Sequence, residues 1–385
     1  MRRYEKTGAW NPDPEKMVPE TDPAALSFVA RDDGRVHERG QRRIIAAMKT
    51  MHPRPPLIPN HFAVLRAAGS MLCLALTASP VAAQQVWFAP PDNLDRGAHT
   101  FNHDFPQLFE AKPAWDPKID VFKISPKMGS TVGPAEQLNR INVFLKDRHI
   151  ALAVSVGAML LDNRDPVPGE CGFGVEGSNR PGRNTIEFQR LKQLGIEVRY
   201  VAMDEPLTFG HYYNKKNACR YSIDDVARRV AAAIAEIKQI YPDVRVVDEE
   251  APPITTTAQW NADLPKWLEA YRRATGERLD AVVFDLDWRQ PWQEVVVPGV
   301  RVAHQAGVRA GIFLDGTGPG ESDADAVAAY KRNMASVAAL HAPFDFVEIA
   351  NWTAHPANDL PQSDPNSLTG VLHYYNATYH TSAHN

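Results

Sequence analysis

The hydrophobic residues from Gln84 onward follow two alternating patterns, short continuous runs and longer stretches with helical spacing. Eight short runs are rich in Val, Ile, Phe and Ala, which is typical of strands that are buried on both faces. These runs are residues 86–89, 121–124, 151–156, 198–203, 244–248, 281–285, 310–314 and 346–350. The pattern therefore predicts eight buried strands.

Longer segments between these runs repeat hydrophobic residues every three or four positions, as amphipathic helices do. They are residues 135–148, 185–194, 222–240, 258–275, 295–306 and 323–340. Ser222 and Asp225 resemble a capping box at the start of one such segment. Gly195, Gly276 and Gly307 follow the ends of three others, where a left-handed residue stops a helix at least cost in glycine.

Strand, helix and strand repeated over about 270 residues predict a single (β/α)8 barrel of the TIM type. The alternative is an open doubly wound sheet, which carries a glycine-rich phosphate loop after its first strand. Here Pro90, Pro91 and Asp92 stand at that position instead. The chain after about Pro356 is expected to cover the barrel as a loop and a short helix at 368–375.

The longest apolar stretch, about residues 62–83, lies upstream of the first strand and has the order of a secretory signal. Val81 and Ala83 supply the small residues before a cleavage site, so a mature start near Gln84 is predicted. A transmembrane anchor is disfavoured because the apolar part after Arg66 is shorter than the ~20 residues needed to span a bilayer.

This signal divides the chain into three predicted parts. Residues 1–50 are polar, lack an apolar period and are expected to be disordered. Residues 51–83 form the signal peptide, and 84–385 form the barrel domain. Our hypothesis is that translation begins at Met48 or Met51, which makes the first part an upstream extension.

Cysteine usage agrees with export to an oxidising compartment. Cys73 leaves with the signal, and the remaining pair, Cys171 and Cys219, is expected to form a disulfide. Closing a loop of about 48 residues contributes up to ~4 kcal/mol on the chain-entropy model. A metal-binding pair is the alternative, but no CxxC or HxxxH spacing accompanies these cysteines.

Composition and charge narrow the class of ligand. The chain is 44% hydrophobic and 23% charged, as in ordinary globular proteins, and its formal net charge is -4. Such a chain has no broad basic field for a nucleic acid, so a neutral or weakly charged substrate fits better. Neither a cofactor nor a bound metal is predicted, and no stable membrane anchor is expected after signal cleavage.

Barrel enzymes build their active sites where the strands end, and here those positions are acidic and aromatic. Asp204, Glu205, Pro206 and His211 follow the fourth run. Asp248 ends the fifth run and Glu249 and Glu250 follow it, while Asp285 ends the sixth run and Asp287 and Trp288 follow it. Asp315 follows the seventh run, Glu348 lies on the eighth and Trp352 follows the eighth. The list directs the search for chemistry to carboxyl groups.

Strand alternation predicts which of these side chains face the barrel axis. The helix-facing side must be apolar, which assigns Val282, Phe284, Leu286, Val347 and Ile349 outward. The inward set is Lys123, Val283, Asp285, Asp287, Phe346, Glu348 and Trp352. Carboxylates that converge on one axis raise one another's pKa, which suits a general acid beside an ionised carboxylate. Glycoside cleavage requires that pair.

Asp204-Glu205-Pro206 resembles the Asn-Glu-Pro signature of the large barrel clan of retaining glycoside hydrolases, and Trp352 is similar to that clan's sugar-platform tryptophan. The resemblance implies Glu205 as the general acid. Asp204 replaces the asparagine, and Asp315 stands where the clan carries a glutamate nucleophile. Other barrel glycosidases use aspartates after strands four and six, which nominates Asp204 with Asp285 or Asp287. Both assignments remain open.

The remaining candidates are assigned to substrate binding: Trp288, Trp352, His211, Asp315, Glu249, Glu348 and Lys123. Each candidate also has a structural interpretation. Glu205 can close the rim by a salt bridge, and Asp285 and Asp287 can bond loop amides. Asp315 can form a turn, the glutamates can be solvated, and the tryptophans and His211 can be packing residues.

The sequence thus favours a secreted or periplasmic glycoside hydrolase that cleaves a poly- or oligosaccharide with two carboxyl groups. One alternative is a Ca²⁺- or Mg²⁺-dependent barrel hydrolase such as a phosphodiesterase, because carboxylates also ligate these ions. A second is a non-catalytic glycan-binding barrel, which keeps the aromatic platforms but lacks a suitably spaced acid pair.

Overall fold

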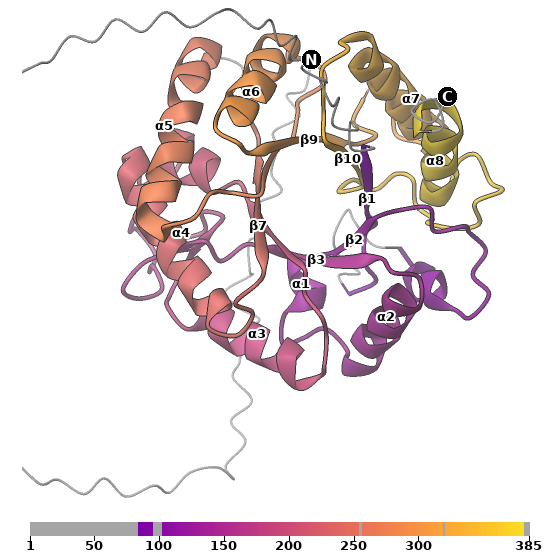
Figure 1. The fold of residues 1–385 in the computed structure, drawn as a ribbon, viewed down its shortest axis with the longest axis horizontal. Coiled ribbons are helices and arrows are strands. Elements are labelled where there is room, and N and C mark those ends of the chain that lie inside the picture. Colours follow the sequence, from indigo (N-terminus) through magenta and orange to yellow (C-terminus); the bar gives the residue numbers. More distant parts are fainter. Residues whose placement is uncertain (1–83, 95–101, 254–255, 319, 381–385) are drawn as a thin grey trace, which may run out of the picture. The chain divides into compact units, whose positions relative to one another are not determined.

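The eight predicted strands close into a parallel barrel in the computed structural model of the protein (Figure 1). The structure describes residues 84–94, 102–253, 256–318 and 320–380. The barrel strands are β1 (Gln85–Ala89), β2 (Val121–Ile124), β3 (Ala151–Val156), β6 (Tyr200–Asp204), β7 (Arg245–Glu250), β8 (Ala281–Phe284), β9 (Arg309–Leu314) and β10 (Phe346–Ala350). Because β1 pairs with both β2 and β10, the sheet has no edge. The prediction of a (β/α)8 barrel is confirmed, and the open sheet is excluded.

Helices surround this barrel in Figure 1. They are α2 (Ala135–Asp147), α3 (Arg183–Gln193), α4 (Ile223–Lys238), α5 (Thr257–Thr275), α6 (Gln293–Gln305), α7 (Asp323–Ala339) and α8 (Leu368–Tyr375), with the short turns η2 (Phe105–Phe109), α1 (Pro126–Gly129), η3 (Thr208–Tyr212) and η5 (Asn376–His380). The predicted helices match within about two residues at each end. Ser222 accepts a hydrogen bond from the Asp225 amide at 3.1 Å, and Gly195, Gly276 and Gly307 have φ of 68°, 79° and 69°. The predicted cap and stops are therefore confirmed.

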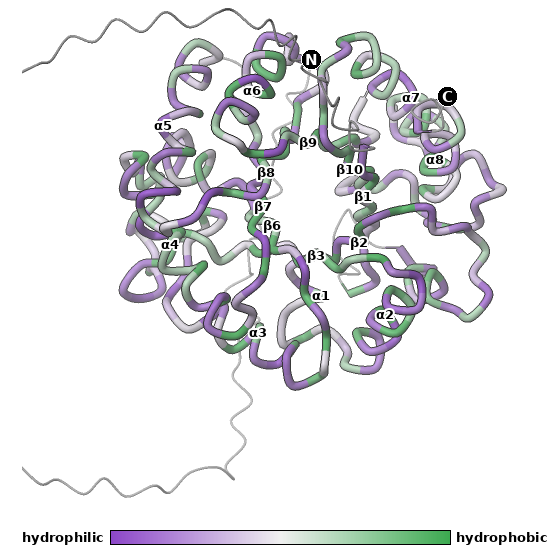
Figure 2. Tube along the Cα trace, viewed as in Figure 1, coloured by the Kyte–Doolittle hydropathy of each residue, from purple (hydrophilic) through white to green (hydrophobic). Residues whose placement is uncertain are grey.

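Strand alternation divides the apolar side chains into two layers. Val282, Phe284 and Val347 belong to the larger layer between the sheet and the helices. Val283 and Phe346 belong to a smaller layer inside the barrel. Figure 2 shows green segments in the barrel strands and alternating green and purple segments along the helices. The inward and outward faces predicted for β8 and β10 are confirmed at these positions.

The long connection after β3 contains structure that the sequence did not predict. Two short strands, β4 (Leu160–Leu161) and β5 (Ser178–Asn179), pair in parallel beside the barrel. The predicted disulfide between Cys171 and Cys219 is present, with a Cα–Cα distance of 4.7 Å. It joins this connection to the one after β6, which fixes the two loops to each other.

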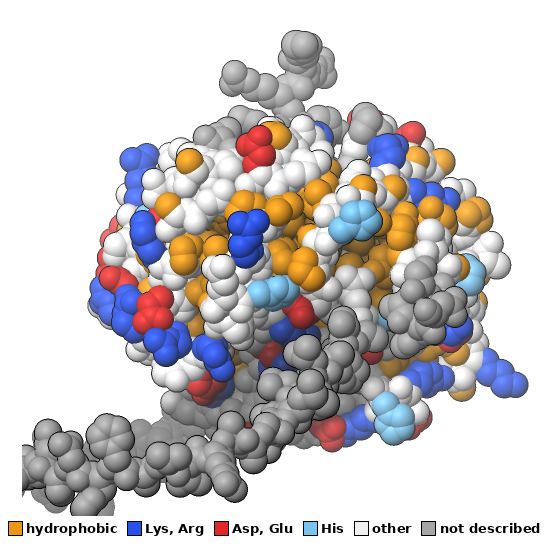
Figure 3. Space-filling view, turned by 45° about the horizontal axis from the view of Figure 1, so that its top comes forward, with side chains coloured by type: hydrophobic (Ala, Val, Ile, Leu, Met, Phe, Trp, Pro, Cys, Tyr) orange, Lys and Arg blue, Asp and Glu red, His pale blue; other side chains and the backbone are white. Residues whose placement is uncertain are grey.

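The predicted signal peptide, the polar segment before it and the proposed translation starts lie outside the described residues and stay predictions. Within the described ranges, no helix combines the length and apolarity needed to cross a membrane. On the face drawn in Figure 3, basic and acidic side chains lie next to one another along one edge, and hydrophobic side chains gather toward the middle. The charge of this face is mixed in sign, as the small net charge predicts.

Candidate active site

A buried ionic cluster occupies the barrel interior and consists of Lys123 from β2, Glu249 from β7 and Glu348 from β10. The Lys123 Nζ atom donates a hydrogen bond to Glu249 Oε1 at 2.5 Å and forms an ion pair with Glu348 Oε1 at 2.5 Å. The three residues are 7%, 5% and 0% exposed. The structure thus brings together three predicted site residues from three strands, all pointing inward as strand alternation requires.

Burial and mutual charge set the protonation of this cluster. Burial, together with the neighbouring negative charge of Glu249, raises the pKa of Glu348 to about 8. Burial also raises the pKa of Glu249, although Lys123 opposes that effect. Burial alone lowers the pKa of Lys123, but the two glutamates together hold it above its ordinary value. Lys123 therefore keeps its positive charge, while burial shifts both glutamates toward the protonated form.

An aromatic floor lies beneath the cluster, toward the amino ends of the strands. The Trp87 ring lies 4.8 Å from Tyr200 and 4.7 Å from Phe346, measured between ring centroids. Trp87 and Glu348 are register partners on neighbouring strands, so the floor and the cluster adjoin. These rings close the interior below the charged groups, as the filled layers of small barrels do.

Asp204 and Glu205 lie at the carboxyl end of β6, at different angles to the axis. Asp204 is the last residue of the strand, is half-buried and pairs in register with Glu249, whose pKa its charge raises further. Glu205 is half-buried and has φ of 50°, a left-handed conformation that few residues other than glycine adopt. The chain leaves the strand at Glu205, so alternation carries Asp204 and not Glu205 to the axis.

The fifth strand was predicted to end at Asp248, but β7 continues through Glu250. Asp248 and Glu250 consequently face the helices. Asp248 accepts a hydrogen bond from Trp267 Nε1 at 2.6 Å. Glu250 accepts hydrogen bonds from the Leu207 and Thr208 amides at 2.6 and 2.9 Å. Glu250 thereby fixes the turn that follows Glu205, and only Glu249 of the three acids reaches the interior.

A second acidic group lies at the ends of β8, β9 and β10. Asp315 is fully buried and accepts hydrogen bonds from Trp352 Nε1 at 2.7 Å and from the Thr317 amide at 2.9 Å. Burial, followed by the charge of nearby Asp285, raises the pKa of Asp315 to about 7. Asp285 itself is half-buried. Asp315 is therefore more than a turn former, because it anchors an aromatic side chain and interacts with a second acid.

The other candidates at this rim differ in accessibility. Trp352 is 37% exposed, and its indole nitrogen donates a hydrogen bond to Asp315. Trp288 packs edge-on against Trp292, with the ring centroids 5.1 Å apart. Asp287 forms an ion pair with Arg289 at 2.7 Å. Arg289 was not among the predicted residues, although a cation two residues after an acid at a strand end was a usable signal.

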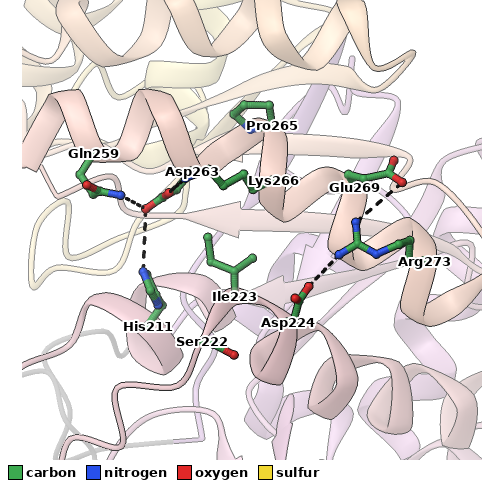
Figure 4. Close-up of a pocket in the computed structure, with 10 residues that line it drawn as sticks. All are labelled: His211, Ser222, Ile223, Asp224, Gln259, Asp263, Pro265, Lys266, Glu269 and Arg273. Atoms are coloured by element: carbon green, nitrogen blue, oxygen red, sulfur yellow. Dashed lines mark hydrogen bonds and ion pairs between the residues drawn. The ribbon is translucent and has the colours of Figure 1, made fainter.

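His211 lies on the outer flank of the barrel, in an open pocket of about 660 Å³ that residues of η3, α4 and α5 line (Figure 4). Its Nδ1 atom donates to the Tyr221 carbonyl at 2.6 Å, and its Nε2 atom lies 3.8 Å from Asp263 Oδ2. Asp263 is 2% exposed and also accepts hydrogen bonds from Tyr212, Gln259 and Lys266. His211 thus takes part in a polar network between helices.

The described residues contain no group of three His, Cys, Asp or Glu side chains placed to hold a metal ion.

A further pair that was not predicted from the sequence joins His355 Nδ1, after β10, to Asp323 Oδ1, at the start of α7, at 2.6 Å. The two residues are 32 positions apart, so no local spacing identified the pair.

No protein-family model and no curated protein match this sequence. Solved structures match at low identity. The GH10 protein of Paenibacillus barcinonensis has 14% identity over 75% of this chain and 89% of its own, with a TM-score of 0.45. The catalytic domain of the beta-amylase of Paenibacillus polymyxa has 9% identity, 78% and 99% coverage and a TM-score of 0.45. The fructose-bisphosphate aldolase of Plasmodium falciparum has 12% identity, 79% and 90% coverage and a TM-score of 0.44. Because enzymes of different classes match at similar scores, the fold assignment rests on the strand pairing of this chain itself.

Proposed function

We propose that this chain is a glycoside hydrolase that cleaves a poly- or oligosaccharide with two carboxyl groups at the carboxyl end of the barrel. The observation that carries the proposal is the pairing of a half-buried acid with a buried acid at two places. Asp204 lies beside Glu249, and Asp285 lies beside Asp315. Acid pairs of this kind favour one protonated and one ionised group, which is the combination that glycoside cleavage needs.

The half-buried acids are the ones that a substrate can reach. We assign the general acid to the Asp204-Glu205 turn and the second carboxylate to Asp285 on β8. Asp315 is fully buried and acts through Trp352, which it holds by a hydrogen bond of 2.7 Å. We assign the sugar platform to Trp352, which is 37% exposed and has an apolar aromatic ring of the kind that stacks on a sugar.

Lys123 supports acid chemistry and not covalent catalysis by an amine. A lysine that attacks a carbonyl group must lose its proton, which requires a lowered pKa. The pKa of Lys123 is instead raised by two glutamates that lie 2.5 Å from Nζ. This lysine therefore serves as a fixed positive charge.

We also propose that the protein is exported. The support is the signal-like order of residues 62–83 in the sequence and the disulfide between Cys171 and Cys219. Disulfides persist in oxidising compartments and are rare in the cytosol. Sequencing the amino terminus of the protein from the culture fluid or periplasm tests this proposal, and a start near Gln84 is expected.

A polysaccharide and oligosaccharide panel tests the proposed activity, with product stereochemistry followed by NMR. We expect hydrolysis in the presence of EDTA, and a loss of at least 100-fold in D285N and in at least one of D204N and E205Q. D243N and E197Q are the matched controls, because Asp243 and Glu197 are exposed at the opposite end of the barrel. Glycan binding without product selects the glycan-binding alternative. Activity that EDTA abolishes selects the metal-dependent class.

A further inference from the structure

The turn that follows β10 carries two partly exposed rings, those of Trp352 and His355. Trp352 is 37% exposed, and the His355 side chain is 34% exposed. Asn351 accepts a hydrogen bond from the Thr353 amide at 2.9 Å and donates one to the Pro356 carbonyl at 3.0 Å. Thr353 Oγ1 donates to the His355 carbonyl at 2.8 Å. These bonds hold the backbone that carries both rings in one conformation.

Both rings are anchored through a ring nitrogen to the neighbouring connection, which leads from β9 to α7. Trp352 Nε1 donates to Oδ2 of Asp315, the residue that directly follows β9, at 2.7 Å. His355 Nδ1 lies 2.6 Å from Oδ1 of Asp323, the first residue of α7. Both rings therefore lie on the side of the turn that faces this connection. Burial and then the charge of Asp285 raise the pKa of Asp315, so the proposed second carboxylate lies near the same connection.

The contact with Asp323 determines which nitrogen of the His355 ring carries the proton. Asp323 Oδ1 also accepts a hydrogen bond from the Ala357 amide at 2.9 Å, as an ionised carboxylate does. Such a carboxylate accepts and cannot donate, so His355 Nδ1 is the donor at 2.6 Å. In the neutral ring the proton then lies on Nδ1, and Nε2 keeps a lone pair that can accept a hydrogen bond.

The Nε2 atom of His355 is open to a ligand. Among the described residues, the ring interacts with Asp323 through Nδ1, and no hydrogen bond or ion pair involves Nε2. The Nε2 atom is not buried. An imidazole that is held at one nitrogen loses little further freedom when a ligand binds at the other, so it is a preorganised acceptor. The hydroxyl groups of a sugar are donors that match such an acceptor.

Two other His–Asp pairs of the described residues lack this combination. His211, on the outer flank, has both ring nitrogens engaged. His304 contacts Asp345 through Nε2 at 2.8 Å, but it lies near the end of α6, at the amino end of the barrel. Of these three histidines, His355 is the one that lies at the carboxyl end with a ring nitrogen available.

We propose that His355 is a substrate-binding residue whose Nε2 atom accepts a hydrogen bond from a hydroxyl group of the sugar unit that stacks on Trp352. Asp323 is its positioning residue, because Asp323 fixes the orientation of the ring and the nitrogen that is left to accept. This inference rests on the proposed function and deepens it. It adds a polar contact to the assigned platform, so that the turn after β10 forms one sugar subsite.

Two variants of His355 separate substrate contact from the bond to Asp323. In H355N the amide nitrogen takes the place of Nδ1, so the bond to Asp323 can persist while the acceptor at Nε2 is absent. In H355Q the longer side chain carries an amide oxygen to the position of Nε2. On the best substrate of the panel we expect H355N to raise KM about 3- to 10-fold with little change in kcat, and H355Q to lie closer to wild type. A wild-type KM in H355N, or a loss confined to kcat, overturns the inference.

A second measurement does not depend on hydrolysis. The D285N variant, in which turnover is expected to be slow, is labelled with ¹⁵N in its histidine rings, and its spectra are recorded with and without neutral tetrasaccharides of xylose, glucose, mannose and galactose. The signals of His355 are those that H355N removes. Without sugar we expect the proton on Nδ1, and with one of the sugars we expect the Nε2 signal to move. His304 is the matched control, because it forms the same kind of pair at the amino end, and its signals are expected to stay in place.

The outcomes separate this inference from the proposed function. An Nε2 signal of His355 that stays in place with every sugar overturns the inference, and hydrolysis by wild type would then leave the proposed function intact. A moved signal in a protein whose wild type hydrolyses no glycan upholds the subsite and selects the glycan-binding alternative. A proton on Nε2 in the sugar-free protein, or equal shifts of His304 and His355, also overturns the inference.

Discussion

The two ends of the barrel interior use charge in opposite ways. At the amino end, Asp280 accepts contacts from both Arg245 and Arg309, and Arg309 also donates to Gln85. The acid there is matched by two bases. At the carboxyl end acids outnumber bases, because Lys123 and Arg289 lie among six carboxyl groups, namely Asp204, Glu249, Asp285, Asp287, Asp315 and Glu348. The same strands therefore carry an end where the charges are paired and an end where buried carboxyl groups have raised pKa values, which is where the proposed active site lies.

The loops at the two ends of the barrel also differ, in length. At the amino end the chain passes from helix to strand in a few residues, as at residues 148–150 between α2 and β3 and at 306–308 between α6 and β9. At the carboxyl end 26 residues, 157–182, separate β3 from α3. Long loops at this end supply the walls of active sites in barrel enzymes. They also carry more conformational freedom, which the disulfide limits.

The largest expected effect comes from removing the only cation of the buried cluster. We expect K123M to lower the free energy of unfolding by about 3–5 kcal/mol, because the variant leaves two glutamates buried without a positive charge. Urea denaturation at pH 7 measures the loss. The double variant K123M/E249Q regains part of it, because one buried charge is then absent. A loss below about 1 kcal/mol contradicts the assignment of Lys123 as the charge that balances this end.

The next effect concerns the loop wall. We expect C171A/C219A to lose about 2–4 kcal/mol of unfolding free energy, because the disulfide closes a loop across a sequence separation of 48. Denaturant unfolding with and without a reductant measures it, and reduced wild type is the matched control. Equal stability of the oxidised wild type and the variant contradicts a stabilising role for the link at the carboxyl end.

The fold was predictable because strand and helix leave different hydrophobic periods. Three strands, including β3 and β10, have the predicted bounds, and the others differ by one or two residues at an end. Cys171 and Cys219 were identifiable by elimination, and the inward position of Lys123 by alternation. Each of these properties can be predicted from one sequence, because periodicity and alternation concern neighbouring residues and the cysteine pairing follows from the small number of cysteines.

The ranking of the acids was less predictable, because it depends on where a strand ends. Extending β7 to Glu250 turns Asp248 and Glu250 outward, and ending β6 at Asp204 removes Glu205 from the inward series. Periodicity locates such ends only within a few residues. His211 was predicted at the carboxyl end of the barrel because it follows a strand. It lies in η3, which places it on the outer side of the barrel beside α4 and α5. The ion pairs of Lys123 with Glu249 and Glu348 join three strands that are far apart in the sequence, so no local sequence pattern predicts them.

The third prediction concerns pH. The pKa of Asp315 is raised to about 7 in the folded protein, so the folded state binds its proton more tightly than the unfolded chain. The stabilising contribution of this group is complete below its unfolded pKa and is lost as pH rises through about 7. Between pH 6 and 7 we expect wild type to lose up to about 1.4 kcal/mol more than D315N. Urea denaturation at both values measures the difference, and equal losses in both proteins contradict the buried state of Asp315.

The smallest effect is expected at the matched end. R309M removes one of two cations on Asp280, but Arg245 remains bound to that carboxylate, and the Arg309 side chain is 25% exposed. Solvent screens partly exposed pairs, so we expect a loss of only about 0.2–1 kcal/mol in urea denaturation, and pH–rate profiles that coincide with wild type. The guanidinium also lies 5.2 Å from the ring of Phe346, which the methionine side chain continues to cover. Phe346 belongs to the aromatic floor, which lies between the two ends. A shifted pH–rate profile in R309M would therefore show that the charge of Arg309 affects the carboxyl end through this floor. The two ends would then not be electrostatically separate.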